Sequence, residues 1–317
     1  MSVGVLERVG ATGLLEPGKP AVVMLSGGRD STCLLDVAAS ICGPSGVTAL
    51  HVNYGLRDDA DADEAFCVSL CERLGVRLET RAAEAPREGN LQGWARDLRY
   101  GAGAELAGRL GADLAAGHTV TDQAETVLYR LAVSPSRRAL LGMPGRRGWL
   151  VRPLLAAGLT REETGGWCEE RGLGWVDDAT NEGTDYARGR VRAVLGELGE
   201  LNPAAEENIA RAAATLSEEA EVLDLVVETA LAGRDEIPLG HLEALPPALA
   251  RLVVRELAER QTGALCPRAA SRLAEILSLD RGSGSAALDV GDGARAVVEG
   301  GVLRFERSPE RSRSTGR

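Results

Sequence analysis

Short apolar runs alternate with amphipathic stretches along the first part of the chain. Residues 22–25 are Val-Val-Met-Leu, and behind a polar turn the apolar side chains recur at helical spacing as far as Ile41. A second apolar run covers residues 47–52 and follows a Gly-Pro-Ser-Gly turn. Short apolar runs predict buried strands, and apolar residues three or four positions apart predict helices. The order strand, helix, strand with short turns is the βαβ unit of a parallel sheet.

The same alternation predicts the rest of an α/β domain. An acidic stretch at 58–64 suits the N-terminus of a helix that runs to Leu74. A third strand is expected at 76–80, a long helix at 90–110, and a fourth strand at 113–117 before another amphipathic helix. Together these elements predict a doubly wound, mostly parallel sheet.

From Asn202 onward the pattern is mainly helical. Apolar positions predict a helix over 203–232, and prolines suit the first turns of two further helices at 246–262 and 267–279. Three short strands are expected after them, at 286–290, 294–299 and 302–306. The second, smaller domain is therefore predicted to be mainly helical and to end in short strands.

We place the domain boundary where the pattern changes. Residues 1–200 form the predicted α/β domain, residues 201–307 form the predicted helical domain, and the polar residues 308–317 are an expected disordered tail. No basic segment precedes an apolar run at the N-terminus, and no stretch reaches the eighteen or so apolar residues of a membrane span. We therefore expect a cytoplasmic protein that does not bind a membrane.

The turn after the first apolar run reads Ser26-Gly27-Gly28-Arg29-Asp30-Ser31. It joins a strand to a helix, where unpaired amide groups and the helix dipole favour an anion. The two glycines allow the backbone to close around a phosphate without Cβ clashes. The turn lacks the lysine of GxxxxGK[ST] and does not fit GxGxxG. The alternative is an ordinary strand-to-helix turn with Ser31 as an N-cap.

Further polar side chains are expected at the same edge of the sheet. His118 and Asp122 follow the fourth predicted strand, and ligands of open α/β sheets bind at the carboxyl ends of the strands. Arg96 and Arg99 lie three residues apart on the long helix and share a face. The carboxylate of Asp30 suits an anion site only if a divalent cation accompanies the phosphate.

Composition limits the class of partner. The net charge of −11 argues against indiscriminate nucleic-acid binding but leaves room for a local basic surface. Lys19 is the only lysine, so phosphate contacts have to come from arginine, which binds bidentately. The six cysteines are scattered, with C-x3-C as the closest spacing. This excludes the usual zinc and iron–sulfur patterns and predicts buried, inert thiols.

The six-residue turn, SGGxDS, resembles the PP-loop of the N-type ATP pyrophosphatases, which split ATP into AMP and pyrophosphate. Further segments follow it in order: HVNYGLR, ARDLRY, GHTVTDQAET, LLGM, RPLL and WVDDATN…YARGRVR. The whole set, from about residue 22 to residue 192, resembles the tRNA(Ile)-lysidine synthases. SGGxDS alone identifies the superfamily, and the later segments carry the resemblance to this family.

Four positions and one short segment depart from the family pattern. Tyr54 stands where the family has histidine in HVNHGLR, and Thr119 and Thr121 replace a histidine and an acid in HHxDDQAET. Gly189 replaces an asparagine in the last segment, and Ser-Pro-Ser-Arg-Arg at 134–138 replaces a glycine-rich stretch. These changes leave the ATP site supported, and they weaken a proton-transfer role near the two threonines.

The resemblance implies a reaction in two steps. The C2 carbonyl of the wobble cytidine of tRNA(Ile), anticodon CAU, attacks the α-phosphate of ATP and expels pyrophosphate, and the amine of free lysine then displaces AMP. The implied cofactors are ATP and Mg²⁺, and the implied partners are this tRNA and lysine. The assembly state, a homodimer included, is left open by the sequence.

The resemblance also implies roles for individual residues. The ATP-binding set is Ser26, Gly27, Gly28, Arg29, Asp30 and Ser31, with Val52 offering backbone groups to adenine. The catalytic set is Asp30, Arg96, Arg99, His118 and Asp122, of which Asp30 and Asp122 position Mg²⁺. The expected tRNA contacts are Arg137, Arg138, Arg188, Arg190 and Arg192.

Two classes of alternative remain at this point. The first is another PP-loop enzyme, either a tRNA thiolase, which C-x3-C on a helix supports poorly, or an amidating synthetase. The second is an inactive nucleotide-binding or RNA-binding module, which the intact SGGRDS segment argues against.

Overall fold

The structure is a computed structural model that describes residues 2–55, 60–83, 91–134, 136–176, 187–279 and 284–309. It divides into two compact units, Met1–Leu216 and Ser217–Arg317. The sequence pattern places the boundary near residue 200, whereas the structural division falls inside helix α10 (Ala205–Leu231). Each unit has a hydrophobic core of its own.

The first unit is built on a six-stranded sheet with the order β3-β2-β1-β4-β6-β5. All neighbouring strands are parallel except β5 and β6. This confirms the predicted doubly wound, mostly parallel sheet. The strands are β1 (Ala21–Met24), β2 (Val47–Asn53), β3 (Arg77–Ala82), β4 (Asp113–Ala115), β5 (Arg146–Arg147) and β6 (Leu150–Val151).

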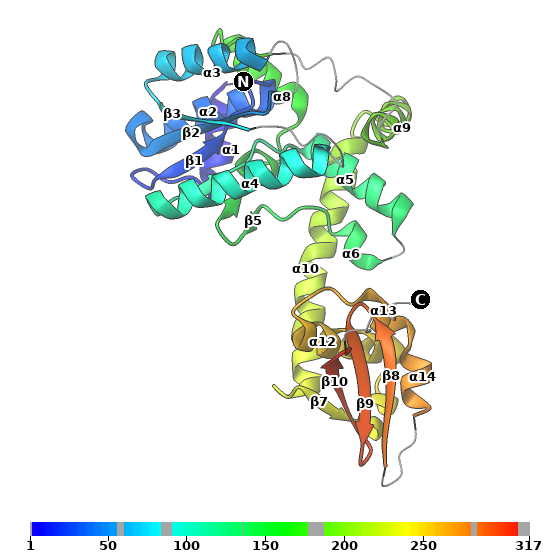
Figure 1. Ribbon diagram of the computed structural model, residues 1–317. Coiled ribbons are helices and arrows are strands. Elements are labelled where there is room, and N and C mark those ends of the chain that lie inside the picture. The colour runs from blue at the N-terminus through cyan, green and yellow to red at the C-terminus, as the bar shows by residue number, and fades with distance from the viewer. Residues whose placement is uncertain are drawn as a thin grey trace, which may run out of the picture. The chain divides into compact units, whose positions relative to one another are not determined.

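Successive residues of β1 face two different cores, as the alternation of side chains in a strand requires. Val23 packs in the core on the side of α1 and α2, whereas Val22 and Met24 pack with Leu106 of α4 on the other side. Figure 1 shows α4 lying along one face of this sheet. The helices of these layers are α1 (Ser2–Ala11), α2 (Arg29–Cys42), α3 (Ala60–Leu74), α4 (Leu91–Leu110) and α5 (Val120–Val133).

Helix α8 (Arg161–Glu170) packs on α2, and the hydrophobic pattern did not predict it. Its start is fixed by a capping box in which Thr160 and Glu163 bond reciprocally to each other's backbone. Its far end is fixed by the buried carboxylate of Asp36, which accepts a hydrogen bond from Trp167 Nε1 at 2.9 Å. The remaining helices of this unit are α6 (Arg137–Leu140), α7 (Pro153–Ala156) and α9 (Ala187–Leu201).

The second unit pairs helices with an antiparallel sheet in the order β7-β10-β9-β8. The helix expected over 267–279 is two short helices, because the amide of Arg272 bonds to the carbonyl of Ala269, three residues back, in a tight turn. The helices are α11 (Leu239–Ala244), α12 (Pro247–Thr262), α13 (Pro267–Ser271) and α14 (Leu273–Leu277). The strands are β7 (Glu236–Pro238), β8 (Ser285–Gly291), β9 (Ala294–Glu299) and β10 (Val302–Arg307).

The structure shows the state of the cysteines and how apolar the helices are. All six cysteines are buried free thiols, as predicted. Burial raises the pKa of the Cys67 thiol to about 12 and that of Cys71 to about 11, so neither is a nucleophile at neutral pH. Within the part of the chain that the structure describes, no helix combines the length and apolarity needed to cross a membrane.

Candidate active site

The SGGRDS segment forms a braced turn between β1 and α2. The hydroxyl of Ser31 donates to the carbonyl of Gly28 at 2.8 Å and accepts from the amide of Ser26 at 3.2 Å. Helix α2 begins at Arg29, and its N-cap, Gly28, has no side chain to cap it. The amides of the first turn are therefore available to an anion, as the sequence predicts. Gly27 has φ +84°, a conformation that suits glycine.

Gly117 brings the loop after β4 against this turn. A Cβ atom at Gly117 would lie 3.0 Å from the backbone oxygen of Asp30, closer than side chains normally pack. The absence of a side chain thus allows the segment from His118 to Asp122 to reach the PP-loop. Sequence reasoning singled out His118 and Asp122 but not the glycine that places them.

Asp30 is held from one side by helix α8. Its Oδ1 accepts a hydrogen bond from the hydroxyl of Thr164 at 2.5 Å, and its Oδ2 lies 3.4 Å from Nε of Arg161. Burial raises the pKa of Asp30, while the bond from Thr164 and the charge of Arg161 oppose that rise. Neither Thr164 nor Arg161 was predicted to belong to the site.

Asp122 is part of the helix cap of α5. Its Oδ2 accepts from the amide of Thr119 at 2.8 Å and from the Thr119 hydroxyl at 3.0 Å, in a capping box. The hydroxyl of Thr121 donates to Glu206 of α10 at 2.5 Å. Both threonines that depart from the family pattern therefore have structural hydrogen bonds.

His118 is a neutral imidazole at pH 7. Burial lowers its pKa to about 4; the carboxylate of Asp122 opposes this shift, and the charges of Arg152 and Arg99 add to it. Its buried Nδ1 has no hydrogen-bond partner among the described residues. This ring nitrogen is therefore a buried polar atom without a partner in the part of the chain that the structure describes.

Five arginines gather on the other side of His118, and we call them the arginine cluster. The guanidinium groups of Arg96 and Arg99 lie 4.8 and 5.7 Å from the ring centre of Tyr100. Burial lowers the pKa of both Arg130 and Arg152, and the charges of neighbouring arginines lower it further. The cluster is Arg96, Arg99, Arg130, Arg147 and Arg152.

The loop of the LLGM segment fixes two members of this cluster. Arg130 Nη1 donates to the carbonyl of Gly142, and Arg152 Nη1 donates to the carbonyl of Pro144, both at 2.8 Å. The amide side chain of Gln123 clamps Met143 by its backbone nitrogen and oxygen. Among the described residues, no carboxylate forms an ion pair with any arginine of the cluster, so its charge is available to an anion.

The predicted tRNA contacts lie in two places. Arg137 and Arg138 begin α6, and Arg137 donates to the carbonyl of Leu216 at 3.2 Å. In α9, Arg192 forms an ion pair with the buried Glu125 at 2.6 Å, and Arg190 is exposed. Arg188 and Gly189 also belong to α9. The side chain of Arg188, and residues 177–186 of the last family segment, lie outside the described residues.

Three further positions have defined surroundings. Val52 is buried near the end of β2, beside the edge where the PP-loop lies. Arg29 packs along α8, where a Cβ at Gly165 would lie 3.1 Å from its Cδ. Tyr54 contacts Trp94 of α4 edge to face, with the ring centres 5.9 Å apart, so an aromatic contact replaces the family histidine.

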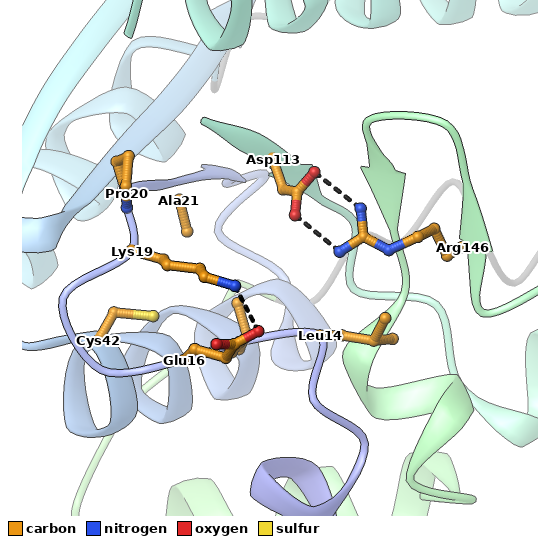
Figure 2. A pocket seen from close by; sticks show the side chains of 9 residues that line it. Leu14, Glu16, Lys19, Pro20, Ala21, Cys42, Asp113 and Arg146 are labelled. Carbon is orange, nitrogen blue, oxygen red and sulfur yellow. Dashed lines mark hydrogen bonds and ion pairs between the residues drawn. The ribbon is translucent and has the colours of Figure 1, made fainter. Parts of the chain in front are cut away.

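A small pocket lies at the opposite edge of the sheet. Asp113 at the start of β4 binds Arg146 through two hydrogen bonds of 2.9 and 2.7 Å, and Lys19 binds Glu16 (Figure 2). The pocket is lined by Leu14, Leu15, Glu16, Lys19, Pro20, Ala21, Cys42, Asp113 and Arg146. Its polar groups are paired with one another, and it adds nothing to the site at the carboxyl edge.

Comparison with known proteins agrees with this geometry. A family model described as a PP-loop domain matches residues 10–198. A tRNA(Ile)-lysidine synthase of Symbiobacterium thermophilum is 37% identical over 96% of this chain and 68% of its own length. The chain belongs to the tRNA(Ile)-lysidine synthase family. The enzyme of that name from Pseudomonas putida is 36% identical over 72% of this chain and 57% of its own length.

The chain is shorter than its curated relatives. It spans between about half and two thirds of the length of the relatives that it matches. Among solved structures, a U34-tRNA thiolase from Methanococcus maripaludis, solved with its [4Fe-4S] cluster, has a TM-score of 0.57 at 18% identity. That match covers 68% of this chain and 78% of the thiolase chain, and it shows a common fold.

The carboxyl edge of the sheet offers two carboxylates to a metal ion. In the described ranges, no group of three or more His, Cys, Asp or Glu side chains is arranged to hold one. The two carboxylates Asp30 and Asp122 do converge, because each lies within 4 Å of the same guanidinium. Mg²⁺ commonly takes one or two carboxylates and completes its shell with phosphate oxygens and water. The pair therefore fits a magnesium ion that arrives with a nucleotide.

Proposed function

We propose that this chain ligates lysine to C2 of the wobble cytidine of tRNA(Ile), anticodon CAU, with ATP cleaved to AMP and pyrophosphate. The observation that carries the proposal is the meeting of an anion cradle, two carboxylates and the arginine cluster at one edge of the sheet. Membership of the family supplies the substrate class. ATP and tRNA are cytoplasmic, and we expect the protein to act there.

In the first step the O2 atom of cytidine attacks the α-phosphorus, and the bond to the bridging oxygen of pyrophosphate breaks. The leaving group gains negative charge, which the first-turn amides of α2 stabilise. Mg²⁺, when bound, neutralises further charge on the phosphates. Asp30 and Asp122 would hold that ion, and the braced hydroxyls of Ser26 and Ser31 would shape the cradle.

In the second step the lysine amine attacks C2, and the C2–O2 bond breaks, so O2 leaves with AMP. The amine has to be deprotonated to attack. Neutral His118 lies at this edge, and its role would be to orient the adenylated base by a hydrogen bond from its imidazole. The arginine cluster would hold the phosphodiester backbone that flanks the target nucleotide.

The test is incubation with ATP, radiolabelled lysine and an unmodified tRNA(Ile) transcript with the anticodon CAU. We expect label in the tRNA together with release of pyrophosphate and AMP in equal amounts. A transcript in which uridine replaces the wobble cytidine is the control and should take up no label. Pyrophosphate release on another acceptor without lysine transfer would reject this reaction and leave another PP-loop activity.

A further inference from the structure

The guanidinium of Arg161 lies between the two carboxylates of the site. Its Nε is 3.4 Å from Asp30 Oδ2, and its Nη2 is 3.9 Å from Asp122 Oδ1. The arginine side chain is 31% exposed, whereas the two acids are 14% and 22% exposed. Arg161 is thus the cation that two acids from different elements share, and Asp30 has a second cation, Arg29, whose Nε lies 3.8 Å from its Oδ1.

The geometry leaves one oxygen of each acid for this cation. Asp30 Oδ1 is bound by Thr164, and Asp122 Oδ2 is bound by Thr119. The other oxygen of each acid is the one nearest Arg161. Since Mg²⁺ also binds carboxylate oxygens, a divalent cation and Arg161 compete for the same two atoms.

The backbone of Arg161 is fixed, so only its side chain is free to leave. The residue follows the N-cap of α8, and its amide donates to the hydroxyl of Thr121 at 3.3 Å. The hydroxyl oxygen of Thr164, which donates to Asp30, also lies 2.9 Å from the carbonyl oxygen of Arg161, so the two acceptors share its one proton. A long, partly exposed side chain on a fixed backbone can turn away without moving the helix.

We propose that Arg161 is a positioning residue, which holds Asp30 and Asp122 together in the absence of a divalent cation and is displaced when the cation binds. The inference rests on the role for the two acids in the proposed function. It adds that the side chain of Arg161 fills the cation site when no metal is bound, and that this side chain has to move before a metal can bind.

This role predicts two effects of opposite sign when Arg161 is removed. In metal-free buffer the two acids lose the cation that they share, while only Asp30 keeps Arg29 nearby, so their mutual repulsion lowers the temperature at which the protein unfolds. A divalent cation meets no competitor, so it binds more tightly and restores the melting temperature by mass action. A side chain that only packs the helix would lower the melting temperature with or without the cation.

The experiment compares the wild-type chain with R161Q in the absence of ATP and tRNA. Mn²⁺ binding is measured from the electron paramagnetic resonance signal of the free ion. Thermal unfolding is followed in EDTA and in roughly 10 mM Mg²⁺. We expect R161Q to bind Mn²⁺ about tenfold more tightly than the wild type and to recover in Mg²⁺ the melting temperature lost in EDTA. Adding D30N to R161Q should abolish the gain in Mn²⁺ affinity.

R8Q is the matched control, because Arg8 pairs with Glu163 of the same helix and does not face the two acids. Its melting temperature should fall equally in both buffers. Equal or weaker Mn²⁺ binding by R161Q, or a loss that Mg²⁺ does not recover, would overturn the proposal. If R161Q does not fold, R161M decides, because methionine keeps an unbranched stem without the charge: tighter Mn²⁺ binding than wild type supports the proposal, and equal binding overturns it.

These measurements separate the inference from the proposed reaction, because neither lysine nor tRNA is present. If the protein transfers no lysine but shows both effects, the proposed role of Arg161 stands and only the proposed reaction is rejected. If the protein transfers lysine but shows neither effect, the proposed reaction stands and the proposed role of Arg161 is rejected.

Discussion

The carboxyl edge of the sheet has two halves that are built in opposite ways. In the acidic half, Asp30, Asp122 and Glu125 each have an arginine within 4 Å. In the basic half, the arginine cluster has no carboxylate partner among the described residues, although the chain as a whole carries a net charge of −11. The acidic half is neutralised by the protein itself, whereas the basic half has charge left for a ligand.

The difference bears on where ATP and tRNA, two of the proposed substrates, would bind. A cation can enter the acidic half only by displacing an arginine, so we expect that half to accept metal together with the nucleotide. In the basic half, an anion competes with no carboxylate of the described residues, although Arg152 itself is buried. We therefore expect the RNA backbone to bind the arginine cluster independently of ATP.

The largest effect is expected in the acidic half. D30N should lower pyrophosphate release at least about a thousandfold, because the Asp30 carboxylate is then lost beside the cradle that receives the leaving group. D113N is the control, since Asp113 lies at the opposite edge and is paired with Arg146. If D30N kept its activity, the acidic half would not be where the metal and the nucleotide bind.

The next effect concerns His118, which lies between the halves. Its folded pKa, about 4, is below the ordinary value of 6.5, so its contribution to stability is complete above pH 6.5 and is lost as the pH falls toward 4. Over that range the free energy of unfolding should fall by up to about 3 kcal/mol more in the wild type than in H118Q.

Urea unfolding at pH 7, 5.5 and 4.5 measures this difference, because the interval from pH 7 to pH 4.5 contains most of the expected change. H241Q replaces an exposed histidine of the second unit and controls for the loss of an imidazole. Parallel pH profiles for the wild type and H118Q would mean that His118 is not held neutral by its surroundings.

The smallest effect is expected in the basic half. R130Q should weaken tRNA binding about tenfold and reduce the slope of log affinity against log salt by about one, because one phosphate contact is lost. Filter binding without ATP at several salt concentrations measures both quantities. R146Q, which removes an arginine paired at the opposite edge, should leave the slope unchanged. If the slope for R130Q equals that of the wild type, the RNA backbone does not bind in the basic half.

Local chemistry explains what the sequence predicted well. The PP-loop could be predicted because a strand, a glycine-rich turn and a helix follow one another within a few residues of Ser26. His118 and Asp122 were readable because they follow a strand in the same sheet. The parallel sheet itself followed from the alternation of apolar runs and amphipathic stretches.

The rest depended on contacts between distant segments. Thr164 and Arg161 bond to Asp30, about 130 residues earlier in the chain, from a helix with few apolar residues. The signal that could have located that helix is the capping box of Thr160 and Glu163. The pairing of Glu125 with Arg192 had no local signal, because it joins α5 to α9 across 67 residues.

Arg29 occupies the position of SGGxDS that the motif leaves unspecified. In this chain its side chain lies against Gly165, where a Cβ would come within 3.1 Å of it. The two positions share one volume, so a larger residue at 165 requires a smaller one at 29. We expect them to covary among relatives, because the residue at the variable position of the motif has to fit against its partner on α8.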